Sequence, residues 1–362
     1  MGKRKICKIV FVILSIFLCV AFYELFGICI AYKKQPEVSN TIKKETQNDS
    51  WNERSENMER AVIIEKNPEA LLQRVRLIRN AKEDIILSTF AFQSDESGKL
   101  ILGALHDAAD RGVHVRLLVD GMESWIDMEG NPYFYGLSSH ENVEIKLYNK
   151  ANPLKPWKMM GRMHDKYLIA DGKRYILGGR NTYNYFLGDF PGHKNYDRDV
   201  LVVCDEPEKE NSVNQLLEYF ETIWEQEDSG YFHDNKKLAN RKSVKNAVLE
   251  LQNGYQKYFE ENKERICDTD YTDETFETEK IALVSNPIHT GPKEPVVWYQ
   301  LGELMKNAKE RVKIHTPYII CNDMMYNTWK EIAERVPDFS IMTNSVANNG
   351  NPFGSADYAR NR

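Results

Sequence analysis

One histidine and one lysine stand in a stretch whose other residues have the composition of a buried β-hairpin. The stretch is RMHDKYLIADGKRYILGGRN, residues 162–181, in which two apolar runs flank an Asp-Gly-Lys connection. Side chains alternate between the two faces of a strand, so His164 and Lys166 are predicted to project from the same face. A solvated strand face is the ordinary explanation for such a pair. The chemical alternative is an imidazole nucleophile beside an ammonium group that neutralises negative charge.

Helices that alternate with apolar strands are predicted around this hairpin, within a first lobe of residues 61–225. The predicted helices cover about 68–81, 98–110 and 211–224, and the predicted strands are DIILSTFAF, VHVRLLVDG, NVEIKLYN and DRDVLVVC. This alternation is typical of an α/β fold built in layers. The sheet would therefore hold the hairpin, and with it the histidine and the lysine, at a fixed place.

Two further regions follow the first lobe. Residues 226–278 are charged and are predicted to be a connector, helical between about 244 and 264, with a solvated surface. The alternation of elements resumes over 279–362. In order, the prediction is the strand KIALVSN, a helix over about 296–308, the strand VKIHTPYII, a helix over about 323–335 and the strand FSIMTNS.

An internal repeat links the two α/β regions. Residues 78–86 read IRNAKEDII and residues 305–313 read MKNAKERVK. Each segment closes a predicted helix, leads into a strand and then passes through a second helix to a second strand. Four elements keep their order and spacing, which favours two copies of one α/β unit over a chance likeness of two helix ends.

The first 32 residues have the composition of a membrane anchor. A basic start, MGKRKICK, precedes an apolar stretch of the length that a bilayer-crossing helix needs. A cleaved signal peptide is the rival interpretation, but the stretch is long and no small-x-small cleavage site stands out. Basic residues on both sides make the orientation signal weak, and we favour the N-terminus inside. Residues 33–60 are polar and are predicted to be a flexible linker.

Composition limits the classes of partner and cofactor. The net charge of −6 gives no general attraction to nucleic acid. The six cysteines form no CxxC pair or Cys/His cluster, and no Asp/Glu cluster has metal-ligand spacing. We therefore expect no metal and no cofactor. The sequence makes no prediction about the oligomeric state.

The hairpin motif resembles a known family. His164, Lys166 and Asp171 fit HxK(x)4D, and the glycine pair before Asn181 fits the G-G-x-N that follows it. This pattern is similar to the HKD motif of the phospholipase D superfamily, within which DESGKLILGALHDAADRGVHVRLLVDG is similar to bacterial cardiolipin synthases. The resemblance covers 66–225 well and 279–362 more loosely. It implies two repeated phospholipase D-like α/β lobes, each a mixed sheet flanked by helices, after an N-terminal transmembrane helix.

The resemblance also identifies a departure from the family. Members of the family carry two HKD motifs, one in each lobe, which meet at a pseudo-twofold active site. Only the first motif is present here, and its counterpart would fall near position 390, beyond Arg362. We therefore expect the second lobe to be incomplete, through truncation or loss of its half-site, and the chain as given to be inactive alone.

The family chemistry implies a role for each motif residue. His164 would attack phosphorus and form a phosphohistidine, while Lys166 and Asn181 would bind the phosphoryl oxygens. Asp171 belongs to the catalytic motif but sits at the turn, too far along the strand for direct contact with the imidazole, so its expected task is to fix the hairpin. Asp197 and Asp199 are candidates for orienting the imidazole, with ordinary strand-entry polarity as the alternative.

Two loops beside the motif carry aromatic residues. The stretch KPWKMMGRM, residues 155–163, mixes basic and aromatic side chains and has the composition of a segment that enters lipid headgroups; a core-edge loop is the alternative. The stretch GMESWIDMEGNPYFYGLSS, residues 121–139, is turn-rich, and we expect a packed surface loop there rather than a cover for the substrate cleft.

Four functions follow from these observations. The first is a phosphatidyltransferase of the cardiolipin synthase type, anchored in a bacterial cell membrane and acting on phosphatidylglycerol or a similar phospholipid, with its body outside the cytoplasm. The second is a phospholipase D that releases phosphatidic acid. A nuclease is disfavoured by the acidic charge and the anchor, and no nucleic-acid partner is expected. The fourth is a non-catalytic phosphate-binding membrane protein that lacks the second motif.

Overall fold

The structure, a computed structural model, describes residues 3–48, 59–204, 211–233 and 235–345. The chain divides into two compact units, which are treated separately. The first comprises residues 1–34, 53–283 and 288–292, and the second comprises 35–52, 284–287 and 293–362. The connector predicted over 226–278 therefore belongs to the first unit, which differs from the predicted domain boundaries.

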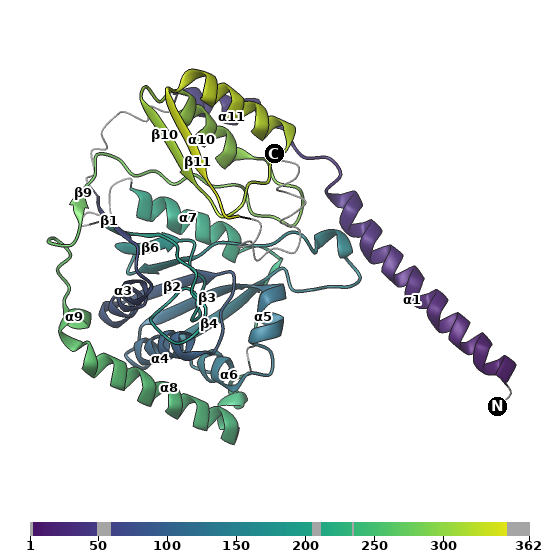
Figure 1. Ribbon diagram of the computed structural model, residues 1–362. Coiled ribbons are helices and arrows are strands. Elements are labelled where there is room, and N and C mark those ends of the chain that lie inside the picture. Colours follow the sequence, from purple (N-terminus) through teal and green to yellow (C-terminus); the bar gives the residue numbers. More distant parts are fainter. Residues whose placement is uncertain (1–2, 49–58, 205–210, 234, 346–362) are drawn as a thin grey trace. The chain divides into compact units, whose positions relative to one another are not determined.

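A mixed sheet forms the centre of the first unit, and among the described residues it has nine strands (Figure 1). Their order is β8-β4-β3-β2-β5-β6-β7-β1-β9. Strands β2, β3 and β4 run parallel, and the other pairings are antiparallel. The bounds are β1 Arg60–Ile64, β2 Asp84–Thr89, β3 His114–Asp120, β4 Val143–Tyr148, β5 Tyr167–Ala170, β6 Arg174–Gly178, β7 Asp199–Val203, β8 Ser229–Tyr231 and β9 Phe276–Glu277.

Helices cover both faces of this sheet, because the central strands are apolar on both faces. Ile85 of β2 packs into one core and its neighbour Ile86 into the other. Helix α7 covers the second face, and α3, α4, α6, α8 and α9 lie on the first (Figure 1). The bounds are α3 Asn67–Asn80, α4 Glu96–Asp110, α5 Gly121–Asp127, α6 Pro132–Ser138, α7 Ser212–Trp224, α8 Lys242–Glu261 and α9 Lys263–Cys267.

The long helix of the connector is part of the core rather than a solvated insert. Apolar residues of α8 such as Leu251 and Tyr255 are buried against α4. A glycine at the crossing allows this approach, since a Cβ at Gly103 would lie 2.7 Å from the Leu251 carbonyl oxygen. The charge of the connector had suggested a solvated surface, but its apolar stripe forms a third layer on the sheet.

The β5–β6 hairpin is confirmed, and the Asp171 carboxylate fastens it to β2. The turn uses two left-handed residues, Asp171 with φ 52° and Gly172 with φ 57°. The carboxylate accepts hydrogen bonds from the backbone amides of Lys82 (3.0 Å), Glu83 (2.8 Å) and Asp84 (3.2 Å). The carboxylate thereby occupies donors at the entrance of β2, so the end of the hairpin is fixed far from His164.

The second unit repeats the element order of the first lobe. Helix α10, Val296–Lys306, leads to β10, Arg311–His315, and α11, Asp323–Arg335, leads to β11, Asp338–Met342. Strands β10 and β11 pair in parallel, as β2 and β3 do. The order helix, strand, helix, parallel strand is therefore present in both units and confirms the repeat. The expected end of the second lobe lies outside the described residues.

Three stretches differ from the sequence-based expectation. The linker predicted over 33–60 contains helix α2, Asn40–Asn48. Arg60, the last residue of the predicted linker, begins β1, and residues 49–58 lie outside the described residues. The predicted loop over 121–139 contains helices α5 and α6, each started by a side-chain cap. KIALVSN forms no strand: the Leu283 amide bonds the Gln215 side chain of α7, so its apolar residues pack on that helix.

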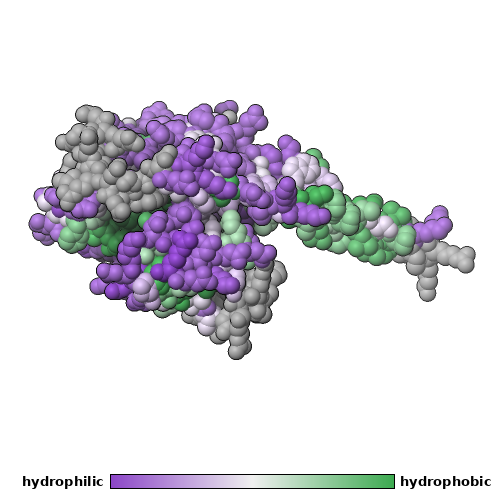
Figure 2. Space-filling model, turned by 90° about the horizontal axis from the view of Figure 1, so that it is seen from above, coloured by the Kyte–Doolittle hydropathy of each residue, from purple (hydrophilic) through white to green (hydrophobic). Residues whose placement is uncertain are grey.

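The N-terminal segment is helical over Lys3–Ala31, helix α1. Residues 8–31 are long and apolar enough to cross a membrane, by length and composition. Figure 2 shows the apolar surface along most of this helix. This agrees with the predicted anchor, although a signal sequence has the same character.

Replacing Asp171 should destabilise the fold. In D171A three backbone donors lose their acceptor and an alanine takes a left-handed backbone, so we expect a loss of about 1–3 kcal/mol in unfolding free energy. D171N, which keeps one oxygen and tolerates φ above zero, should lose less. Denaturant unfolding in detergent measures both. D189A, at an exposed carboxylate, is the control, and a D171A curve that coincides with it contradicts the anchoring role.

Candidate active site

His164 lies at the solvent-facing edge of the first unit, in the extended segment that leads into β5. The strand itself starts at Tyr167, so His164 and Lys166 precede it, although the Lys166 carbonyl still accepts the Gly178 amide at 3.1 Å. The ring of His164 has an exposed edge, while Phe90 packs against it with 4.4 Å between ring centroids. The imidazole is thus both accessible and held.

The pKa of His164 is lowered to about 4. Burial of the ring is the main cause, and the nearby positive charges of Lys166 and Arg162 add to it, whereas the Asp120 carboxylate opposes it. At neutral pH the imidazole is therefore unprotonated. An unprotonated ring nitrogen is the form that can attack an electrophile.

Lys166 is buried and supplies the positive charge of the site. Its Nζ donates a hydrogen bond of 2.7 Å to the His164 carbonyl oxygen. Burial lowers the pKa of its ammonium to about 8, against the opposing charges of Asp165, Asp197 and Asp120. A buried ammonium gains when an anion arrives, because the anion replaces the water that the group has lost.

Phe90 is a shared neighbour of the three basic groups. Its ring lies 4.4 Å from the His164 ring, and 5.1 Å from both the Lys166 Nζ and the Arg162 guanidinium carbon. Cations favour the face of an aromatic ring, so Phe90 stabilises two positive charges at close range without neutralising them. Sequence reasoning had placed Phe90 in a strand and had not assigned it to the site.

The segment before His164 is fixed by the buried carboxylate of Asp120, at the end of β3. Asp120 accepts hydrogen bonds from Arg162 Nη2 at 2.6 Å and from the Met163 amide at 3.1 Å. It also accepts from the Met122 amide at 3.0 Å and so caps α5. The sequence signal was available, since β3 ends in Val-Asp at the edge where parallel strands finish, but Asp120 was missed.

Asp165 points the other way from its neighbours, which confirms the predicted alternation. Its carboxylate accepts a hydrogen bond of 2.7 Å from Tyr219 of α7. Burial, together with the negative charge of Asp165, raises the pKa of Tyr219, which stays a donor. His164 and Lys166 consequently share the Phe90 side, and the residue between them fastens the segment to α7.

The glycine pair of the motif allows two aspartates to approach the hairpin. A Cβ at Gly178 would lie 2.0 Å from Asp199 Oδ1, and a Cβ at Gly179 would lie 2.1 Å from Asp197 Oδ2. Any larger residue would push these carboxylates away. The negative charge of Asp197 raises the pKa of Lys166 and so partly offsets the effect of burial.

The two candidates for orienting His164 have other partners. Asp199 is fully buried between Arg74 at 2.8 Å and Arg180 at 3.3 Å. Asp197 accepts from the Arg198 amide at 2.7 Å. None of these contacts is with the imidazole, and the orienting role of the two carboxylates stays a prediction. A buried carboxylate on a central strand needs cations, and the arginines supply them.

Asn181 lies in the wall beside Phe90. Its side-chain oxygen accepts the Ala91 amide at 3.2 Å, and Phe92 and Thr182 form a parallel bridge next to it. The amide therefore holds the chain that carries Phe90. Its predicted contact with a phosphoryl oxygen stays a prediction.

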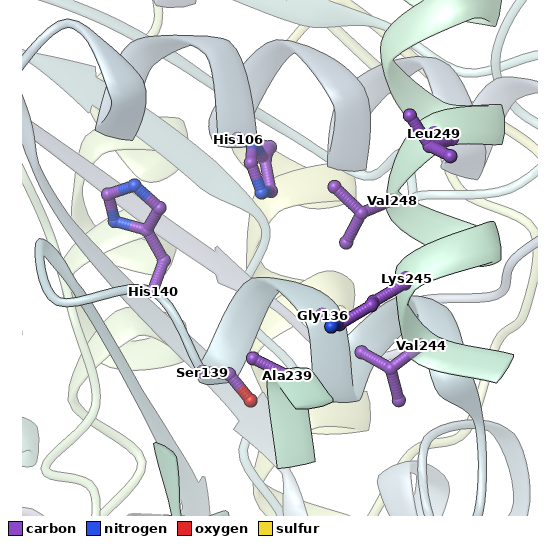
Figure 3. A pocket seen from close by; sticks show the side chains of 9 residues that line it. All are labelled: His106, Gly136, Ser139, His140, Ala239, Val244, Lys245, Val248 and Leu249. Carbon is purple, nitrogen blue, oxygen red and sulfur yellow. The ribbon is translucent and has the colours of Figure 1, made fainter. Parts of the chain in front are cut away.

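A separate pocket lies between α4, α6 and α8 and contains none of these residues (Figure 3). His106 and His140 line one side of it, with ring centroids 5.4 Å apart, and both bond Asp110. Val244 and Val248 of α8 line another side. Within the described residues no group of three or more His, Cys, Asp or Glu side chains has the geometry to hold a metal.

Removing the Phe90 ring should raise the pKa of His164 toward the value of a solvated imidazole. In F90A the ring gains water, so its pKa should rise from about 4 toward 6.5. Diethyl pyrocarbonate modifies only unprotonated imidazole, so wild-type His164 should react at the same rate at pH 5.5 and 7.5, whereas F90A should slow at pH 5.5. Peptide mass spectrometry measures the modification of His164 in both proteins. Wild-type His164 that reacts more slowly at pH 5.5 than at pH 7.5 contradicts the burial argument.

Comparisons with known proteins agree with this geometry. Residues 75–224 match the family model described as cardiolipin synthase, PLD-like (phospholipase D-like) domain. A Helicobacter pylori protein named only as uncharacterized is 28% identical over 315 residues, covering 79% of this chain and 59% of that protein. Cardiolipin synthase C of Escherichia coli is 29% identical over 171 residues, covering 43% and 34% respectively. The chain thus spans less than two thirds of these relatives.

A solved structure shares the fold over most of the chain. The crystal structure of phosphatidylserine synthase from Haemophilus influenzae has a TM-score of 0.56 and 16% identity, covering 88% of this chain and 71% of that chain. The matched segment 75–224 contains the HKD hairpin, the glycine pair and β2 to β7. Residues 75–224 are therefore similar to the phospholipase D-like domain of the cardiolipin synthase type.

Proposed function

We propose that the protein transfers a phosphatidyl group between phospholipid alcohols, as cardiolipin synthases do, through a phosphohistidine on His164. The observation that carries this proposal is the pairing of an accessible, unprotonated imidazole with a buried ammonium group. A phosphodiester carries an electrophilic phosphorus, which the imidazole can attack, and one negative charge, which the ammonium group can bind. The family match over 75–224 supports the same substrate class.

The first chemical step would break one ester bond of the phosphodiester. A ring nitrogen of His164 donates its electron pair to phosphorus, and the bond to the departing alcohol oxygen breaks. Lys166, with its ammonium near Phe90, would neutralise the oxygens on which charge develops. The departing oxygen takes a proton from an acid that family members supply from the second lobe. Addition of a second alcohol, with loss of its proton to that group, would release His164.

The acceptor decides among the chemical outcomes. A lipid glycerol hydroxyl gives phosphatidyl transfer, and water gives phosphatidic acid, the alternative activity. A nucleic-acid phosphodiester has the same reactive group, but the net charge of −6 opposes its approach. A phosphate-binding protein without turnover is the alternative if no second histidine completes the site.

The anchor fits a lipid substrate. Residues 8–31 have the length and apolarity of a single membrane-crossing helix, which would keep the first unit beside its substrates. We propose a cell-membrane location with the N-terminus inside and the body on the outer side, in line with the weak charge asymmetry of the flanks.

An activated diester tests the role of His164 separately from the second half-site. Bis(p-nitrophenyl) phosphate has a leaving group that departs without a proton, so the chain should release about one p-nitrophenolate per molecule and become labelled on His164. H164A should show no burst. H114A is the matched control, because His114 begins β3 at the opposite end from Asp120. An unchanged burst in H164A removes His164 as the nucleophile.

Phosphatidylglycerol vesicles then identify the acceptor. Full-length protein that yields cardiolipin supports transfer, whereas phosphatidic acid alone supports the hydrolase. Neither product, with a His164 burst still present, shows that His164 reacts but that this chain alone does not turn over lipid. Neither product and no burst support the binding-protein alternative.

The pH dependence of the reaction with the activated diester should reflect the lowered pKa values of His164 and Lys166. Since His164 must be unprotonated and Lys166 protonated, the second-order rate constant of the p-nitrophenolate burst should fall below about pH 4 and above about pH 8. Unperturbed groups would place these limits near 6.5 and 10.4. In K166R the guanidinium stays charged, so the upper limit should vanish while the maximum drops. An upper limit that persists in K166R assigns it to another group.

A further inference from the structure

Two exposed apolar segments lie beside the active-site edge. Trp125 and Ile126 are on α5, and Leu154, Trp157 and Met160 are on the loop that precedes Arg162. These five side chains, named here the apolar rim, are 44–77% exposed. Large apolar side chains gathered near a polar site, rather than scattered singly, indicate a surface that contacts an apolar partner.

Both segments are held in place by polar interactions that belong to the site. Arg162 bonds Asp120 at 2.6 Å and Glu123 of α5 at 3.2 Å, which ties the start of α5 to the chain just before His164. Asn149 Nδ2 donates to the carbonyls of Lys158 (2.7 Å) and Gly161 (2.8 Å). The exposure of the rim is therefore built into the fold and is not a feature of a loose loop tip.

The rim segment at 154–157 meets the apolar helix α1. Tyr23 donates a hydrogen bond of 2.9 Å to the Leu154 carbonyl, and a Cβ at Gly27 would lie 2.5 Å from Pro156 Cγ. A residue larger than glycine at 27 would therefore displace the loop. Both contacts lie about 6–12 Å inside the end of the apolar segment 8–31, at 1.5 Å per residue. The loop thus lies at the depth where such a helix would leave a bilayer.

We propose that the apolar rim enters the interfacial layer of the lipid bilayer and sets the height of His164 at the phospholipid headgroups. This inference rests on the proposed function and names the surface through which the substrate arrives. Tryptophan prefers this layer, because its ring is apolar and its N–H finds a hydrogen-bond acceptor there. The exposed Lys155 beside the rim would face anionic headgroups.

The bilayer explains the rim better than a protein partner does. The loop of the rim contacts α1 at Leu154 and Pro156, so a membrane that accommodates the helix would also meet this loop without a further binding event. The reacting diester of a phospholipid stays in the interface, so a nucleophile at that height acts without extracting the acyl chains. Extraction would expose those chains to water at about 0.8 kcal/mol per CH₂ group.

Quenching by brominated lipids measures the depth of the rim. Full-length protein is placed in phosphatidylglycerol vesicles whose acyl chains are brominated near the headgroup, where only tryptophans inside the lipid lose fluorescence. W125F and W157F should each remove part of the quenching seen in the wild type, and the double variant most of it. The matched control is W224F, because Trp224 of α7 is buried in the core; its loss should leave the quenching unchanged.

The outcomes separate this inference from the proposed function. Quenching that is the same in the wild type, W125F and W157F contradicts the proposal that the apolar rim enters the bilayer, whether or not lipid is turned over. A protein partner on this surface would give that result. Quenching lost in both variants, with neither lipid product nor a His164 burst from the wild type, keeps the membrane contact and removes the phosphatidyl-transfer proposal.

Discussion

The ion pair between Asp120 and Arg162 is the interaction on which the site depends. Asp120 is fully buried, and a buried carboxylate without its cation costs about 3–5 kcal/mol. The same carboxylate caps α5 and binds the Met163 amide, so one group fixes the helix of the apolar rim and the backbone before His164. The position of the imidazole and the position of the proposed membrane contact are therefore set together.

Burial lowers the pKa of both reactive groups, His164 and Lys166, and the consequence for the site differs between them. It keeps His164 unprotonated, ready to donate an electron pair, and it makes the charge of Lys166 costly until an anion arrives. Phe90 contributes to both effects, since its ring covers the imidazole and faces the ammonium group. A phosphodiester would thus relieve an unfavourable state of the free site, which is a physical reason for selective binding.

The glycines of the motif serve the sheet as much as the chemistry. Gly178 and Gly179 leave space for the carboxylates of Asp199, which starts β7, and of Asp197 just before it. Asp199 pairs with Arg74 and Arg180, and the negative charge of Asp197 raises the pKa of Lys166. In the same way Asp171 acts at a distance, through the amides at the start of β2. These motif residues therefore act on the fold: they hold the segment that carries His164 beside Phe90, which follows β2.

The sequence by itself determined the hairpin, the parallel α/β order, the internal repeat and the apolar helix, because periodicity, turn residues and spacing can be read along the chain without knowing which residues touch. It also identified His164 and Lys166, whose alternation with Asp165 follows from strand geometry. Only the tertiary structure decided that Phe90 and Asp120 join them and that Asp199 pairs with arginines. Those contacts link residues far apart in sequence, and the partner of a charge is chosen by burial and packing, which no local pattern encodes.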